Sequence, residues 1–121
     1  MNEFIIREHQ ADRAGHHYDL HLGTDDTFLS WAVPKGVPTQ INKRVLAIKT
    51  AEHSSEGARF TGTIPKGQYG AGETEVLDEG ELEMISHSPS HYFFHIMGDL
   101  YRGYYYLRHW KDSKWLLWRR P

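Results

Sequence analysis

Hydrophobic and polar residues alternate over short segments of this chain, a pattern typical of half-buried β-strands. In the segment 17–22, His17, Asp19 and His21 would share one face of a strand, while Tyr18 and its alternating neighbours point into a core. No segment carries a sustained helical period, although 54–58 fits a single turn. The pattern predicts strands over 4–7, 17–23, 28–33, 44–50, 73–78, 81–85, 91–97, 103–110 and 114–119.

Clusters of Gly, Pro, Asp and Lys predict turns between most of these strands, at 24–26, 34–36, 78–80, 97–99 and 111–113. So many short strands in 121 residues predict one all-β domain over 1–121. We expect a compact, mostly antiparallel, closed or nearly closed β-barrel of about eight or nine strands, with at most short helical turns, because closure removes exposed strand edges. A two-sheet sandwich is the alternative architecture.

Composition narrows the classes of function. The chain has no cysteine, which excludes disulfides, thiolate zinc sites and a cysteine nucleophile. It has no apolar run of signal-peptide or membrane-span length, so we expect a cytoplasmic protein with no membrane partner. The formal net charge of −2 argues against a general nucleic-acid coat but leaves room for a local basic patch.

Histidines are concentrated near the N-terminus. Nine occur in the chain, and His9, His16, His17 and His21 fall within thirteen positions. His17, Asp19 and His21 on one strand, with His9 from a neighbouring strand, form a nitrogen and oxygen ligand set suited to Mn, Fe or Zn. The polar, solvent-facing side of an ordinary strand would show the same spacing.

Other candidate groups lie in turns and loops. The glycine-rich segment 62–72 has neither the dinucleotide-binding nor the P-loop pattern, so its glycines provide unusual backbone angles, a close approach to a partner, or a tight crossover. His53 follows a predicted strand and is a candidate acid–base group, with a solvated loop histidine as the alternative. Candidate phosphate ligands are Lys35, Arg44, Arg59 and Lys66.

Seven motifs follow one another along the chain: FIIREH at 4–9, HYDL at 17–20, SWAVPKG at 30–36, KR at 43–44, EH at 52–53, FxGxIPxGxYGAG at 60–72 and WLL at 115–117. Taken together and in this order, they resemble the 3′-phosphoesterase family. This family is known as the end-healing module of bacterial DNA ligase D and as small stand-alone proteins of archaea and bacteria. The matching motifs cover nearly the whole chain, and SWAVPKG and IPxGxYGAG are long and specific.

The resemblance implies a β-barrel with a metal-dependent site in a crescent-shaped groove. The implied metal is Mn²⁺, with Zn²⁺ or Co²⁺ as other possibilities. The implied reactions remove a 3′-terminal ribonucleotide (phosphodiesterase) or a 3′-phosphate (phosphomonoesterase) and leave a 3′-hydroxyl during DNA repair by non-homologous end joining. The implied partners are nucleic-acid 3′ ends, including primer-template DNA, together with a separate repair ligase and polymerase.

Position by position, the resemblance also implies site residues. The metal ligands fall on His9, His17 and Asp19. The catalytic groups fall on His53 and Arg44, with His21 at the place of an arginine that the family usually has. The groups expected to bind phosphate or nucleic acid are Arg44, His21, Lys35, Lys66 and Tyr69.

Three departures from the family pattern bear on this site. The segment between His9 and His17 is longer than usual, His21 replaces the arginine, and Gly57 replaces a tyrosine near His53. Histidine clamps phosphate more weakly than a bidentate arginine, so His21 would contact either the phosphate or the metal. The alternatives to an enzyme of this family are a non-catalytic end-binding module and a cupin-type small-molecule metalloenzyme, although the cupin histidine signature is absent.

Overall fold

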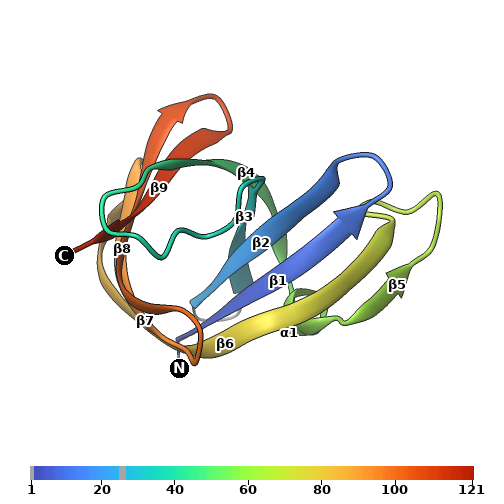
Figure 1. The fold of residues 1–121 in the computed structure, drawn as a ribbon, viewed down its shortest axis with the longest axis horizontal. Coiled ribbons are helices and arrows are strands. Elements are labelled where there is room, and N and C mark those ends of the chain that lie inside the picture. The colour runs from blue at the N-terminus through green and yellow to red at the C-terminus, as the bar shows by residue number, and fades with distance from the viewer. Residues whose placement is uncertain (1, 25–26) are drawn as a thin grey trace.

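The computed structural model describes residues 2–24 and 27–121. The predicted turn at 24–26 therefore falls largely on residues 25 and 26, outside the described residues. Within them lie one short helix, α1 (Ser55–Arg59), and nine strands (Figure 1). The strands are β1 (Glu3–Ala11), β2 (Gly15–Thr24), β3 (Thr27–Val33), β4 (Val45–His53), β5 (Gly62–Ile64), β6 (Gly72–Ser88), β7 (His91–Met97), β8 (Arg102–Lys111) and β9 (Lys114–Arg120).

Eight of the strands close into an antiparallel barrel. They follow the order β1-β2-β3-β4-β9-β8-β7-β6, and β6 pairs back onto β1. The short β5 pairs only with β6 and lies outside the ring (Figure 1). The predicted all-β, closed antiparallel barrel is confirmed, and the two-sheet sandwich is excluded. No helix in the described part of the chain is long and apolar enough to cross a membrane.

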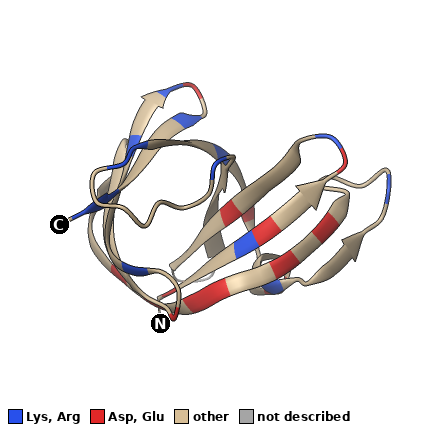
Figure 2. Ribbon diagram, viewed as in Figure 1, with Lys and Arg blue, Asp and Glu red and all other residues tan. Residues whose placement is uncertain are grey.

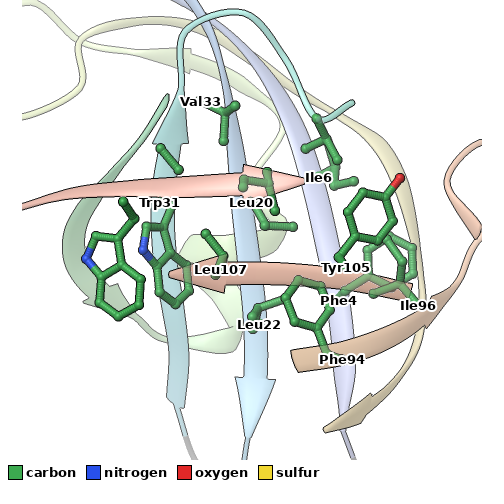
Figure 3. Packing of buried hydrophobic residues seen from close by; sticks show 14 of the residues in the cluster. Phe4, Ile6, Leu20, Leu22, Trp31, Val33, Phe94, Ile96, Tyr105 and Leu107 are labelled. Atoms are coloured by element: carbon green, nitrogen blue, oxygen red, sulfur yellow. The ribbon is translucent and has the colours of Figure 1, made fainter. Parts of the chain in front are cut away.

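The inward faces of the strands fill the barrel with large apolar side chains. Leu20 and Leu22 of β2 meet Phe94 and Ile96 of β7 in one cluster, and each is at most 1% exposed (Figure 3). Alternation along β2 therefore predicted its inward face correctly. Trp31 anchors the centre through edge-to-face contacts with two other aromatic rings, which are Tyr92 and Trp115.

The outward face of β1, β2 and β3 is also covered in part. Ile5, Phe28 and Ala58 form a second, smaller cluster that holds α1 against this face. Ser54 caps α1 by accepting a hydrogen bond from the backbone N–H of Gly57, which confirms the predicted helical turn. The strand face that carries His17, Asp19 and His21 is thus shielded from bulk water at one end, and this makes a recessed site possible.

One predicted turn is wrong. Residues 78–80 continue β6, which runs unbroken through the two strands predicted at 73–78 and 81–85. A side chain at position 80 would meet the carbonyl oxygen of Met97 at 2.3 Å, so Gly80 serves close strand packing rather than a turn. Next to it, Glu81 pairs with both β1 and β7. The alternation pattern missed β5, because three residues are too few to show a period.

Asp78 anchors the β7–β8 turn, and its removal should destabilise the barrel. Its buried carboxylate accepts hydrogen bonds of 2.8–3.1 Å from the backbone N–H groups of Glu79, Asp99, Leu100 and Tyr101. Asp78→Ala leaves these donors unpaired, so we expect a loss of about 2–4 kcal/mol in the free energy of unfolding, measured in urea. Asp99→Ala, at an exposed carboxylate of the same turn, should change it by under about 0.5 kcal/mol. Equal losses would contradict this role.

Candidate metal centre and active-site groove

A groove of about 1050 Å³ lies on the outward face of β1–β4. Its floor comes from these four strands, and its walls come from the β1–β2 hairpin loop and from the glycine-rich loop that precedes β6. A hydrogen bond from the backbone N–H of Asp12 to the carbonyl oxygen of Ala71 connects the two walls.

His9, His17 and Asp19 meet on the floor of this groove. His9 and His17 are direct cross-strand partners, and Asp19 follows two positions along β2 on the same face. Nδ1 of His9 lies 3.3 Å from Oδ2 of Asp19, and Nε2 of His17 lies 3.2 Å from Oδ1. One potential ligand atom from each residue falls within 4.8 Å of the other two. The structure thus brings together the three predicted metal ligands.

Two backbone carbonyls orient the imidazoles. Nε2 of His9 donates to the carbonyl oxygen of Gly70 at 2.7 Å, and Nδ1 of His17 donates to that of Gly15 at 3.2 Å. A carbonyl only accepts, so in each neutral ring the other nitrogen carries a lone pair, and both lone pairs face Asp19. Nδ1 of His9 is buried without a well-formed hydrogen bond. These residues fit a divalent metal, and three protein ligands leave coordination positions open.

The electrostatics favour a cation at the same point. Burial alone would raise the pKa of Asp19, but the adjacent imidazoles of His17 and His9, which attract the carboxylate whenever they are protonated, outweigh burial and hold the pKa below its usual range. Asp19 in turn raises the pKa of His9. The carboxylate is therefore ionised and shared between two imidazoles, which is the charge state that a metal ligand needs.

Arg7 is a site residue that the motif comparison did not single out. Its guanidinium is 5% exposed, lines the groove and lies 3.6 Å from Asp19 Oδ2. One terminal nitrogen donates to the carbonyl oxygens of Gly57 and Phe60, while Nε has no partner among the described residues. Burial lowers its pKa and Asp19 opposes this. Strand alternation already places Arg7 on the face of His9, and this signal could have revealed it.

His53 lines the groove where β4 ends, and a serine connects it to His21. Ser30 Oγ lies 2.9 Å from Nδ1 of His53 and 2.7 Å from Nδ1 of His21. His21 is fully buried, and burial followed by the charge of Arg7 lowers its pKa to about 3. The neutral His21 lies behind Ser30 rather than in the lining of the groove, a position from which it can orient His53 but does not reach the groove surface.

The predicted phosphate ligands separate into two groups. Lys66 and Tyr69 line the groove, on the loop before β6, and Tyr69 is 81% exposed. Lys35 and Arg44 are not among the lining residues, and the Arg44 guanidinium lies 4.6 Å from the centre of the Trp118 ring. Arg59 lies beside Glu3 and Glu79 and forms ion pairs with both. Phosphate binding stays a prediction for Lys66, Tyr69, Lys35 and Arg44.

Comparisons with known proteins place this groove in a family. The sequence pattern of the DNA Ligase D 3′-phosphoesterase domain matches residues 7–109. A multifunctional non-homologous end joining DNA repair protein LigD from Mycobacterium tuberculosis is 38% identical over 119 residues, and the match covers 95% of this chain and 15% of that protein.

Two further relatives agree. A multifunctional non-homologous end joining protein LigD from Mycolicibacterium smegmatis is 44% identical over 82 residues, which cover 68% of this chain and 10% of that protein. A protein of the same description from Pseudomonas aeruginosa is 33% identical over 123 residues, which cover 94% of this chain and 14% of that protein. The chain spans at most 15% of the length of these relatives. The family pattern, the barrel and the histidine–aspartate groove agree, and the chain belongs to the DNA ligase D 3′-phosphoesterase domain family.

Proposed function

We propose that this protein is a metal-dependent phosphoesterase that repairs nucleic-acid 3′ ends. It removes 3′-terminal ribonucleotides as a phosphodiesterase and 3′-phosphates as a phosphomonoesterase, and the 3′-hydroxyl that it leaves serves a ligase or polymerase in DNA end joining. The convergence of His9, His17 and Asp19, with both free imidazole lone pairs aimed at one carboxylate on the floor of a groove, is the observation that carries the proposal.

His9, His17 and Asp19 would hold the metal. Two imidazole nitrogens and a carboxylate suit Mn²⁺, with Zn²⁺ and Co²⁺ as further candidates, and the absence of thiolate ligands leaves all three open. Bound there, a divalent metal would polarise a phosphate oxygen and withdraw charge that develops on it. The three residues are fixed before any substrate arrives, because backbone carbonyls already orient both rings.

Arg7 and His53 would act on the phosphate from the floor of the groove. Within residues 2–24 and 27–121, Nε of the Arg7 guanidinium has no hydrogen-bond partner, so it can bind a phosphate oxygen beside the metal ligands. His53 is held at Nδ1 by Ser30, which leaves Nε2 to accept a proton from attacking water or to donate one to the leaving alcohol. Burial and Arg7 lower the pKa of His53, which favours the neutral ring near neutral pH.

The direct test offers the protein a primer-template DNA that carries a 3′-phosphate, together with Mn²⁺. We expect conversion to a 3′-hydroxyl, read out as extension by a polymerase, and no conversion when a chelator removes the metal. A second substrate with one 3′-terminal ribonucleotide tests the diesterase reaction. Binding of both DNAs without any product would instead favour a non-catalytic end-binding module and overturn the proposal.

Arg7→Gln should separate phosphate binding from metal binding. The amide keeps hydrogen-bonding capacity but loses the charge, so we expect kcat/KM for 3′-phosphate removal to fall by about a hundredfold. Mn²⁺ affinity, measured by titration calorimetry, should stay within about threefold, since Arg7 is not a metal ligand. The matched control is Arg13→Gln, because Arg13 also lines the groove but lies in the exposed hairpin loop. Equal losses in both variants would count against a specific role of Arg7.

A further inference from the structure

The outward face of β7, β8 and β9 carries a set of stacked rings away from the groove. In register, Phe93 faces Tyr106, and Tyr106 faces Trp118, with ring centres 5.8 and 4.9 Å apart. A parallel pair, His95 and Tyr104, stacks at 4.4 Å beside them. We call these rings the aromatic ladder, and it consists of Phe93, His95, Tyr104, Tyr106 and Trp118.

The ladder is not part of the barrel core. Its residues alternate along β7 and β8 with inward residues such as Phe94, Tyr105 and Leu107, each of which is 0% exposed. Tyr104 is 41% exposed, and His95, Phe93 and Tyr106 are half-buried. Trp118, which is 7% exposed, forms the buried end of the ladder. Aromatic surface left facing water in this way is typical of a binding surface rather than of a fold requirement.

Positive charge follows the same strands. Residues 91–121 contain six Lys or Arg against two Asp or Glu, a net charge of +4, whereas residues 1–90 contain eight against fourteen, a net charge of −6. Figure 2 shows Lys and Arg on β8 and β9 and Asp and Glu along β6. Exposed arginines share the outward face of the ladder at positions 102, 108 and 120, and the Arg120 guanidinium lies 5.9 Å from the Tyr106 ring. The overall net charge of −2 conceals this asymmetry.

Arg44 connects the ladder to the groove. Arg44 directly precedes β4, and the outward residues Ile48 and Thr50 of β4 line the groove. At the other end, Arg44 lies over Trp118, because β4 pairs with β9. At about 3.3 Å per residue, Ile48 is about 13 Å from Arg44, and the three strand spacings from β4 to β7 add about 14 Å. One outward surface therefore leads from the metal ligands across β4 onto the ladder.

We propose that the aromatic ladder binds single-stranded nucleic acid, namely the stretch 5′ to the end that lies in the groove. Stacked rings bordered by guanidinium groups suit bases and phosphates without sequence preference, and either DNA or RNA provides both. Arg44 then contacts the strand on its way to the groove rather than the reacting phosphate. The position of the bound 3′ end rests on the proposed function, but binding by the ladder does not require hydrolysis.

The experiment measures binding first and hydrolysis second. A fluorescent oligothymidylate of about 12 nucleotides is titrated with the full chain in the absence of metal, and anisotropy gives the dissociation constant. Tyr104→Ala/Tyr106→Ala should weaken binding roughly tenfold or more, since base–aromatic stacking is worth about 1–3 kcal/mol per base. Tyr104→Phe/Tyr106→Phe keeps both rings and should bind like the wild type. Leu100→Ala, at an apolar residue 62% exposed in the β7–β8 turn, is the control for lost apolar surface.

Hydrolysis then tests whether one nucleic-acid strand runs from the ladder to the groove. The substrates are 3′-phosphorylated oligothymidylates of increasing length. For the wild type, kcat/KM should rise with the length of the substrate. For the alanine variant, kcat/KM should equal the wild-type value on the dinucleotide and should not rise with length. Unchanged oligothymidylate binding by a folded alanine variant overturns the proposal. So does self-association of the wild type that the variant abolishes, which would assign the face to a second copy of the chain. A third outcome is that the variant loses oligothymidylate binding while the wild type hydrolyses no substrate. This outcome would support binding by the ladder and reject only the proposed function.

Discussion

Asp19→Asn should reduce 3′-end hydrolysis by about a thousandfold or more while the protein still folds. The substitution keeps the shape of the side chain but removes the anion that lies between His9 and His17. Without that charge the site loses both a metal ligand and the electrostatic attraction for a divalent cation. A loss of this size corresponds to about 4 kcal/mol of transition-state stabilisation. Steady-state kinetics on a 3′-phosphate oligonucleotide and Mn²⁺ titration calorimetry measure the two effects.

Asp12→Asn is the matched control for Asp19→Asn. Asp12 also lines the groove but is exposed on the hairpin loop and is not among the clustered ligand atoms, so its replacement should change kcat/KM by less than about threefold. Circular dichroism should show native strand content in both variants. Undiminished hydrolysis by Asp19→Asn would reject the metal centre as the catalytic site.

Gly72→Ala, at the first residue of β6, should cause the largest loss of stability in the glycine-rich segment 62–72. A Cβ at this position would lie 2.0 Å from the carbonyl oxygen of Gln10, and the backbone has a φ of 138°. The obstacle is backbone rather than a movable side chain, so we expect the free energy of unfolding to fall by at least about 3 kcal/mol in urea denaturation. Mn²⁺ affinity should fall as well, because the segment also carries the Gly70 carbonyl that orients His9.

Gly67→Ala provides the comparison in the same segment. Gly67 also has a positive φ, 88°, but a Cβ there would meet nothing within 4 Å. Its replacement should cost only the left-handed backbone energy of about 1–2 kcal/mol and leave Mn²⁺ affinity unchanged. If the two alanine variants lost equal stability, close packing against β1 would not be the reason for Gly72.

Local pattern predicted much of this architecture. Alternation along 17–22 identified the inward and outward faces of β2, because the side-chain period of a strand is a local property. Many short strands pointed to a closed barrel, since closure is the common way to remove edges. The same reasoning failed at Gly80, where a glycine required for close packing against Met97 has the local signature of a turn.

Contacts between distant segments account for what local pattern missed. Motif positions indicated His9, His17 and Asp19, and the cross-strand register of β1 and β2 brings them together. Arg7 is held in the site by hydrogen bonds to the carbonyl oxygens of Gly57 and Phe60, which lie about fifty positions away in the sequence. The pairing of β4 with β9 also places the Arg44 guanidinium over Trp118, a contact that spacing did not predict, and its phosphate-binding role stays a prediction.

The amino-acid sequence by itself determined the all-β class, the faces of the main strands and the chemical identity of a histidine–aspartate site, because these depend on spacing along one chain. Only the tertiary structure decided which nitrogen of each histidine is free, that His21 is buried behind Ser30, and that Arg7 lies next to Asp19. Those properties depend on burial and on partners supplied by strands and loops far apart in the chain, which no local pattern records.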